Sequence, residues 1–354
     1  MAKGLLIIKT LTPTHPGAGT SLGAIDLMLQ REVTTNFPFI QGSSLKGAIR
    51  SHLESQPVDD NLARNLINFA KDNGDDELKK EVENLTPDKL TIFRVRLLVQ
   101  KLKKLNKDVK DFEQLYKKLD TVFGPYEAGG ELKKSSLTIT DASLLFYPVR
   151  TLKGLYALVT CPEILRRLNM PHIDLKVPDS LLNLDNKGTV KALKSTKSHY
   201  EINGKVYFED LNFSVENLQD NDLNWTNEKL GLDEGIKNRL FIVHDDVFQY
   251  FVEFATQVMS RNRINYETGI VEKGALWTEE HLPPETYLFS YLEDDGKVIS
   301  KIKKDESKDS KDATPFEWIT DRLNDKVIHL GGDETVGKGF VQLKFKDLSE
   351  GGNG

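Results

Sequence analysis

Short strand-like segments recur along this chain and constrain its fold more than any other feature. Each is rich in β-branched or aromatic residues and is bounded by turn residues or by a helical pattern. Amphipathic helical spacing appears from Ser43 to Leu53 and from Asp245 to Met259. This mixed order predicts an α+β fold of the ferredoxin-like or RRM kind. The expected strands cover residues 5–11, 136–146, 154–159, 205–213, 239–243, 264–268, 275–282, 286–292 and 340–345.

Composition limits the classes of protein that this chain can belong to. With 354 residues, 38% hydrophobic and 29% charged, the sequence is typical of a globular protein with a substantial core. A formal net charge of -6 argues against a protein that coats nucleic acid by its overall charge, although it allows a local basic groove. The single cysteine, Cys161, excludes an internal disulfide framework and indicates a reducing compartment, so we expect a cytoplasmic protein. No apolar run is long enough to span a bilayer.

Two regions differ in composition from the rest and are predicted to be insertions. Residues 56–119 are rich in Lys, Glu, Asp and Leu with helical spacing, which predicts a helical insertion with a solvated face. Residues 171–238 are poorer in apolar residues, and their Asn203-Gly204 dipeptide favours a projecting β-hairpin. Residues 1–55, 120–170 and 239–354 then remain as the RRM-like core.

The segment that follows the first predicted strand is rich in proline and glycine. His15 lies between Pro13 and Pro16, and glycines follow at positions 17, 19 and 23. Glycine allows positive φ and close approach of the backbone, so Gly17 and Gly19 could present N–H groups to a phosphate. Taken alone, such a segment is more often an ordinary connecting loop.

Asp26 follows within an otherwise apolar run from Ala24 to Leu29. Its carboxylate is therefore presented from an ordered element rather than from a loop tip. An aspartate in such a position either caps a turn or serves a function. The neighbouring segments favour the functional interpretation.

The next segment, FPFIQGSSLKGAIR, leads into the first predicted helix. A helix N-terminus offers unpaired N–H groups and the positive end of the helix dipole. Ser43 and Ser44 add hydroxyl groups, and Lys46 and Arg50 lie one turn apart on one face of the helix. The combination predicts a site for a phosphate backbone.

A second glycine-rich segment, HLGGDETVGKG, precedes the last predicted strand. It places Lys338 among glycines at positions 331, 332, 337 and 339. A flexible hairpin turn would have the same composition. The segment is not a phosphate-binding Walker loop, because Gly339 follows Lys338 where such a loop has Ser or Thr.

Taken in order, these motifs resemble those of a known family. THPGAG is followed by IDLMLQRE, FPFIQGSSLKGAIR, VFGPYEAGG, SSLTITDASLLFYPVRT and finally HLGGDETVGKG. The sequence resembles the RAMP superfamily of CRISPR effector proteins from end to end, most closely the backbone subunits of type III-B (Cmr) complexes. The similarity is weakest in the two predicted insertions.

The resemblance implies a modified RRM palm with a helical insertion and a thumb-like β-hairpin. It also implies that copies of the chain stack head to tail along a guide CRISPR RNA, together with other Cmr subunits. In such proteins the regions that match Ser43 to Arg50 and the late glycine-rich segment grip the guide backbone. The thumb displaces nucleotides of the guide–target duplex at regular intervals. The implied RNA-binding residues are Gly17, Gly19, Ser43, Ser44, Lys46, Arg50, Gly331, Gly332, Gly337, Lys338 and Gly339.

The resemblance further implies a metal-dependent endoribonuclease that cuts complementary single-stranded target RNA. The residue that matches the family's catalytic position is Asp26, which would assist attack by the RNA 2′-OH or hold a transient Mg²⁺ or Mn²⁺ ion. His15 is the second catalytic candidate, through contact with a phosphate. A scaffold that only holds the guide, and a stand-alone endonuclease that processes the guide precursor, remain the alternatives.

Overall fold

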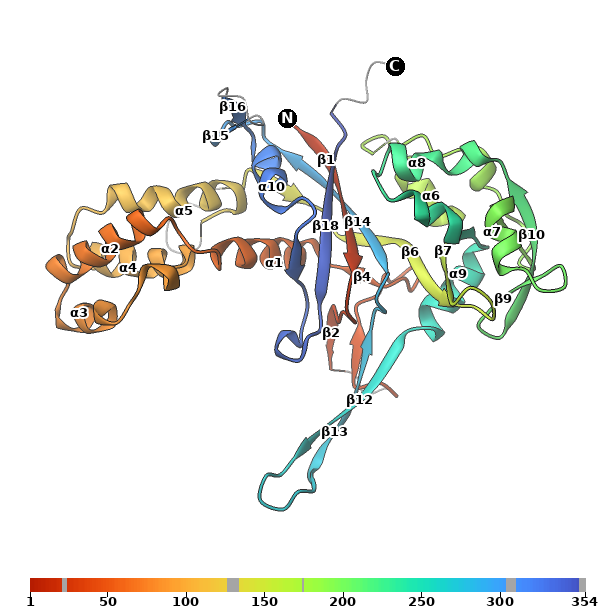
Figure 1. The fold of residues 1–354 in the computed structure, drawn as a ribbon, viewed down its shortest axis with the longest axis horizontal. Coiled ribbons are helices and arrows are strands. Elements are labelled where there is room, and N and C mark those ends of the chain that lie inside the picture. The colour runs from red at the N-terminus through yellow and green to blue at the C-terminus, as the bar shows by residue number, and fades with distance from the viewer. Residues whose placement is uncertain (21–23, 126–133, 174, 304–309, 350–354) are drawn as a thin grey trace. The chain divides into compact units, whose positions relative to one another are not determined.

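The computed structural model describes residues 1–20, 24–125, 134–173, 175–303 and 310–349 (Figure 1). The chain divides into two compact units. The helical unit comprises residues 1–2, 46–138 and 293–321, and the sheet unit comprises residues 3–45, 139–292 and the chain from Arg322 onward. Within the described residues, no helix is both long enough and apolar enough to cross a membrane.

The main sheet has the strand order β17-β18-β1-β14-β6-β7-β11-β8-β10-β9, and β4 pairs with β6 beside this path. The central strands β18, β1, β14 and β6 follow the order of a ferredoxin-like sheet, since the chain runs β1, α1, β6 and then β14, α10, β18. The fold class predicted from the sequence, an α+β ferredoxin-like palm, is therefore confirmed. The strands are β1 (Lys3–Thr10), β4 (Phe39–Ile40), β5 (Leu137–Ile139), β6 (Ala142–Arg150), β7 (Tyr156–Thr160), β8 (Thr189–Leu193), β9 (Val206–Phe208), β10 (Leu211–Leu218), β11 (Leu240–Ile242), β14 (Tyr287–Asp294), β17 (Val327–His329) and β18 (Phe340–Asp347).

Strand β1 is central because both of its faces are apolar. Leu5, Leu6, Ile7 and Ile8 are all fully buried, as expected for a strand covered on both sides. Its antiparallel partner β18 alternates instead, with Val341, Leu343 and Phe345 buried and the residues between them more exposed. The helices and turns of the sheet unit are α6 (Pro162–Leu168), η2 (Asp179–Leu181), α7 (Lys194–Tyr200), η3 (Asp220–Leu223), α8 (Asn224–Glu228), η4 (Glu234–Arg239), α9 (Asp245–Phe254) and η5 (Glu334–Val336), and α1 (Gly42–Glu54) begins there.

A smaller sheet has the order β12-β13-β3-β2. Strands β12 (Gln257–Ile264) and β13 (Val271–His281) form a long antiparallel hairpin that projects from the main sheet (Figure 1). The base of β13 pairs with β3 (Leu27–Leu29), which in turn pairs with β2 (Gly17–Thr20). The sheet thus brings the hairpin next to the N-terminal glycine-rich segment.

The projecting hairpin does not lie where we predicted it. Residues 171–238 supply β8, β9 and β10, which extend the main sheet. The predicted Asn203-Gly204 turn is present, with φ of 50° and 80°, but it closes only the Ile202–Lys205 bridge. The following strands cannot project because Val206, Phe208 and Phe213 are buried. The long hairpin is instead Gln257–His281.

Two further predictions were wrong near this hairpin. The helix expected to continue to Met259 ends at Phe254, because the chain turns there into β12. Val258 maintained the helical spacing of apolar residues, but it is a half-exposed strand residue. The strand expected at residues 264–268 is the turn of the hairpin, where the Asn265 N–H donates to the Ile270 carbonyl over 2.9 Å.

The helical unit contains the segment predicted as a helical insertion. Its helices are amphipathic, and their buried faces form a separate hydrophobic core that includes Leu66, Leu98 and Leu102. Helix α2 is N-capped by Asp59 and α4 by Thr91, whose side chains accept from backbone N–H groups. The elements are α2 (Asp60–Asn73), α3 (Asp76–Glu83), η1 (Pro87–Lys89), α4 (Ile92–Lys104), α5 (Lys110–Phe123), β15 (Ser300–Lys303), β16 (Ser310–Ala313) and α10 (Pro315–Leu323).

Candidate functional site

Three segments that are far apart in the sequence meet around one pocket of about 190 Å³ in the sheet unit. His15 and Gly17 come from the N-terminal glycine-rich segment, and Gly331 comes from the late one. The start of helix α1 adds Gln41 and Ser44. Pro16, Gln30, Ile40, Leu330 and Gly332 complete the lining. The structure therefore brings together several residues that the sequence predicted to contact RNA.

Glycine is required where the two glycine-rich segments touch. A Cβ on Gly331 would lie 2.7 Å from the His15 carbonyl oxygen, and one on Gly339 would lie 2.4 Å from that of Leu330. Both glycines have positive φ, of 91° and 75°. The Gly339 N–H donates to the Pro13 carbonyl over 3.0 Å. The late segment is thus folded against the early one. The contact requires glycine, because a side chain at Gly331 or Gly339 would collide with the backbone.

Glycine also sets the start of helix α1. A Cβ on Gly42 would lie 2.7 Å from the Ile139 carbonyl oxygen, and the Gly42 N–H donates to Oδ1 of Asp141 over 2.7 Å. The motifs GSSLKG and TDAS are therefore neighbours in the fold. Ser43 and Ser44 remain exposed beside this helix N-terminus, where N–H groups and the helix dipole favour an anion.

His15 is held in a fixed orientation at the edge of the pocket. Its Nδ1 lies 2.6 Å from the Glu280 carbonyl oxygen, which can only accept, so Nδ1 carries the proton. Nε2 faces Gly17, where a Cβ would lie only 2.6 Å from it. Nε2 is thus the ring atom that can contact a ligand in the pocket.

Asp26 lies just before β3, exposed but ordered. Its Oδ2 accepts from the Thr278 backbone N–H over 2.8 Å and from the Thr278 hydroxyl over 2.9 Å. These bonds, the backbone one first, lower the pKa of the Asp26 carboxyl below its usual value. Asp26 is therefore ionised at neutral pH, with one oxygen fixed on β13 and the other directed elsewhere.

Glu280 fixes the strand that carries Asp26. Its carboxylate accepts from the Leu29 N–H over 3.0 Å and from Nη2 of Arg31 over 2.5 Å, and it is almost fully buried. These contacts join β3 to β13 through side chains as well as through the backbone. The position of Asp26 relative to Thr278 follows from this pairing.

Lys46 and Arg50 have partners inside the helical unit. Lys46 Nζ donates to the Leu137 carbonyl over 2.8 Å and to the Ser135 hydroxyl over 2.5 Å. Burial, and secondarily the charge of Arg50, lower the pKa of Lys46. Their helical spacing suggested a basic face towards RNA, but a periodic pattern does not show what packs against that face.

Arg50 belongs to an ion network of the helical unit. Its guanidinium contacts Glu54 and Asp120, each over 3.1 Å, and donates to the Gly124 carbonyl. Arg96 contacts the same two carboxylates. These contacts pair the charge of Arg50 within the protein and do not favour its predicted phosphate contact, which stays a prediction.

The remaining predicted RNA contacts lie outside the pocket. Gly19 in β2 and Gly337 after η5 are exposed, and a Cβ on either would meet nothing within 4 Å. Lys338 is half-buried beside Gly337. Their contact with RNA stays a prediction.

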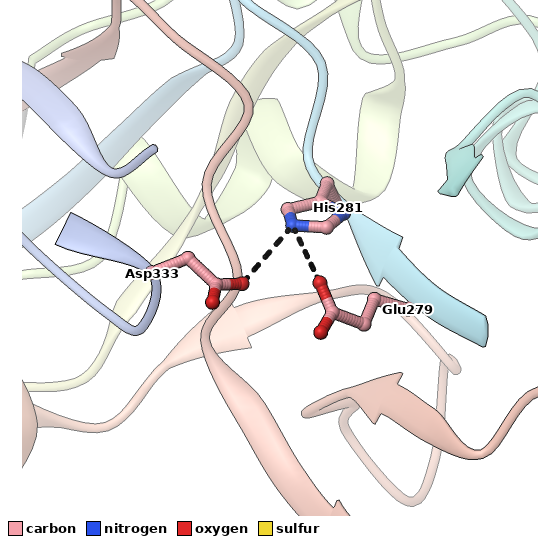
Figure 2. Close-up of side chains that lie close together, drawn as sticks. All are labelled: Glu279, His281 and Asp333. Carbon is pink, nitrogen blue, oxygen red and sulfur yellow. Dashed lines mark ion pairs between the residues drawn. The ribbon is translucent and has the colours of Figure 1, made fainter. Parts of the chain in front are cut away.

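Sequence reasoning missed a buried cluster at the base of the hairpin. Glu279 and His281 on β13 face Asp333 of the late glycine-rich segment, as Figure 2 shows. His281 Nε2 lies 3.7 Å from Glu279 Oε2 and 3.9 Å from Asp333 Oδ2. Burial, followed by the charge of His15, lowers the pKa of His281. The signal was present in the motif TEEH, because alternate residues of a strand share one face.

Comparison with known proteins identifies the family. A family model described as the RAMP superfamily matches residues 7–342. The CRISPR system Cmr endoribonuclease Cmr4 of Pyrococcus furiosus is 30% identical, over 98% of this chain and 97% of that relative. The CRISPR system CMR subunit Cmr4 of Saccharolobus solfataricus is 25% identical, over 96% and 94% of the two chains. The crystal structure of oligomeric Cmr4 from Pyrococcus furiosus has a TM-score of 0.57 at 26% identity, over 99% of this chain and 100% of that one. The chain therefore belongs to the RAMP superfamily and, within it, to the Cmr4 family.

Proposed function

We propose that this chain is the backbone subunit of a type III-B CRISPR ribonucleoprotein and cleaves complementary target RNA with Asp26. The observation that carries the proposal is the ordered, ionised and exposed carboxylate of Asp26, held by Thr278 at the base of the hairpin. The full-length relative that is named an endoribonuclease supports the same activity. We place the assembly in the cytoplasm, with its RNA partners.

The chemistry uses a nucleophile that RNA itself carries. The 2′-OH attacks the adjacent phosphorus and loses its proton, and the bond from phosphorus to the 5′ oxygen breaks. The departing 5′ oxygen takes a proton from water, and the products are a 2′,3′-cyclic phosphate and a 5′-OH. An ionised Asp26 is suited to align the 2′-OH and accept its proton. His15 presents Nε2 to the pocket and would contact a phosphate there.

A divalent ion, Mg²⁺ or Mn²⁺, would assist as a Lewis acid on the phosphate oxygens. Asp26 offers one carboxylate and is not part of the group of Glu279, His281 and Asp333. The other ligands would therefore come from RNA phosphate and water, as is common for Mg²⁺. The ion would be held transiently, only while RNA is bound.

The pocket of His15, Gly17, Ser44, Gly331 and Gly332 is the proposed grip on the guide RNA backbone. Exposed N–H groups at a helix N-terminus and in glycine-rich turns bind phosphate without reading sequence. Guide and target sequences would then be set by base pairing. Copies of the chain would stack head to tail along the guide and bind the other Cmr subunits.

The Gln257–His281 hairpin is the proposed thumb. Its turn carries fully exposed Tyr266 and largely exposed Ile270, and its outer part has no buried residue. Exposed apolar side chains on a narrow projection are suited to insert between bases. The hairpin would thus separate guide and target beside Asp26, which lies at its base.

The deciding experiment compares two aspartates in the reconstituted complex. Asp26→Asn removes the proposed base, and Asp88→Asn is the matched control, since Asp88 is also exposed and its pKa is also lowered, first by a hydrogen bond with a threonine, Thr86. We expect only Asp26→Asn to abolish target cleavage, with guide and target binding intact. Full cleavage by Asp26→Asn would exclude Asp26 as the catalytic residue and favour a scaffold role. Specific cleavage of precursor transcript by the isolated chain would indicate guide processing.

A further inference from the structure

The cluster of Glu279, His281 and Asp333 has no role in the function proposed above. One ligand atom from each residue lies within 4.8 Å of the others (Figure 2). Glu279 and His281 are nearly or fully buried, and the Asp333 side chain is 24% exposed. The cluster is therefore an interior site with one side open to solvent.

His281 provides a second, independent observation. It is completely buried, and neither ring nitrogen has a hydrogen-bond partner among the described protein atoms. Buried polar groups are nearly always satisfied, so an imidazole in this state indicates a ligand. Nε2 is directed between the two carboxylates, at 3.7 and 3.9 Å. These separations are too long for hydrogen bonds.

The same separations suit donors that share one ion. Bonds of about 2.0–2.2 Å place the ligand atoms of a tetrahedral ion roughly 3.4 Å apart. A small inward movement of the side chains would reach this geometry. One imidazole and two carboxylates are ligands that Zn²⁺ and Mn²⁺ accept, whereas Mg²⁺ prefers oxygen ligands alone.

The charge balance also leaves room for a cation. Nη1 of Arg261 lies 3.1 Å from Glu279 Oε2 and 3.3 Å from Asp333 Oδ2, so it is the present counter-charge. Two carboxylates and one guanidinium leave a formal charge of -1 with a neutral imidazole. The Arg261 side chain is 26% exposed on β12 and can turn to solvent when an ion enters.

We propose that Glu279, His281 and Asp333 bind one divalent transition-metal ion, Zn²⁺ in the first instance, and that Arg261 occupies the site when the metal is absent. The ion would join β13 at the hairpin base to the late glycine-rich segment through Asp333. It is distinct from any ion at Asp26, since Thr278 and Glu279 are adjacent on a strand and so face opposite ways.

The test measures metal binding by the full chain without RNA. The purified protein is stripped with EDTA, dialysed, and titrated with Zn²⁺ in competition with a chromogenic chelator. We expect one Zn²⁺ per chain, with affinity reduced about 100-fold by His281→Ala and about tenfold or more by Asp333→Asn. Arg261→Ala, which removes the competing cation, should raise the affinity. His199→Ala, an exposed histidine, is the matched control and should change nothing.

Visible absorption of the Co²⁺-loaded chain provides a second readout. The natural chain and His199→Ala should show the intense bands of a low-coordinate site, and His281→Ala and Asp333→Asn should not. Asp333 is partly exposed, so Asp333→Asn keeps the test decisive even if His281→Ala unfolds. Equal binding by Asp333→Asn and the control would overturn the proposal. Zn²⁺ binding by Arg261→Ala alone would also overturn it, as would the lack of any saturable Zn²⁺ binding.

Discussion

Strand β13 holds two acidic groups, Asp26 through Thr278 and its own Glu279, and their surroundings differ in almost every physical respect. Thr278 holds the exposed carboxylate of Asp26 on one face, while Glu279 is buried on the other among Arg261, Trp277 and His281. The first group is ionised, open to solvent and lightly restrained. The second is enclosed and bound to several partners. We therefore expect that cleavage of RNA and stability of the hairpin base can be changed separately.

The largest expected effect is on the rate of target cleavage, which should depend far more on Asp26 than on Glu279. Asp26→Asn should lower the single-turnover rate constant of target cleavage by about 10²–10⁴-fold, the range for loss of a general base. Glu279→Gln, of similar shape and also without charge, should lower it less than about tenfold, because Glu279 faces away from the RNA. Quenched-flow cleavage assays at saturating target would measure both. Equal losses of the cleavage rate constant in the two variants would contradict the distinction between Asp26 and Glu279.

The second expected effect is on stability, where Glu279 should matter more than Asp26. Glu279→Ala leaves the Trp277 N–H, which donates to Glu279 Oε1 over 2.7 Å, without this partner, and leaves Arg261 with Asp333 alone. It should lower the free energy of unfolding by about 2 kcal/mol, less than for a fully buried pair because Arg261 is partly exposed. Asp26→Ala is a surface change and should lower the free energy of unfolding much less. Urea unfolding of both variants would check this; a larger loss in Asp26→Ala would contradict it.

The smallest expected effect concerns the pKa of Asp26. Thr278→Val removes the hydroxyl bond but keeps the backbone bond, so the lowered pKa of Asp26 should rise part of the way towards 3.8. Because the folded pKa is depressed, the charge of Asp26 contributes stability above the unfolded pKa, and this contribution is lost as pH falls through the folded pKa. Carbon NMR of the carboxyl during acid titration would show the shift. The matched change Thr86→Val should raise the pKa of Asp88 instead.

The sequence predicted the fold class well because the core strands carry strong local signals. The apolar run of β1 and the alternation of β18 identify central strands without any tertiary information. The projecting hairpin was misplaced because Asn203-Gly204 strongly favours a turn, but this turn closes only the Ile202–Lys205 bridge. The true hairpin closes through Asn265 to Ile270, where no such dipeptide occurs.

Candidate site residues could be chosen from sequence where they stand in short motifs. Asp26, His15 and the glycines of the pocket were chosen in this way, and their roles stay predictions. For Arg50, helical spacing could indicate Glu54 on the same helix but not Asp120, which only the folded chain brings to it. Asp333 could not be joined to Glu279 and His281 from sequence, because only the folded late segment brings it to β13.

One hydrogen bond between the early and late glycine-rich segments has a consequence for the order of synthesis and folding. The Phe340 N–H donates to the Thr12 hydroxyl across 328 positions of the chain, beside the Gly339–Pro13 bond. The loop that carries His15 can therefore meet the late glycine-rich segment only after synthesis has passed Phe340. Such distant contacts also form late in folding, since closing a long loop has a large entropic cost. A chain that ends before Phe340 would accordingly lack this contact between the early and late glycine-rich segments.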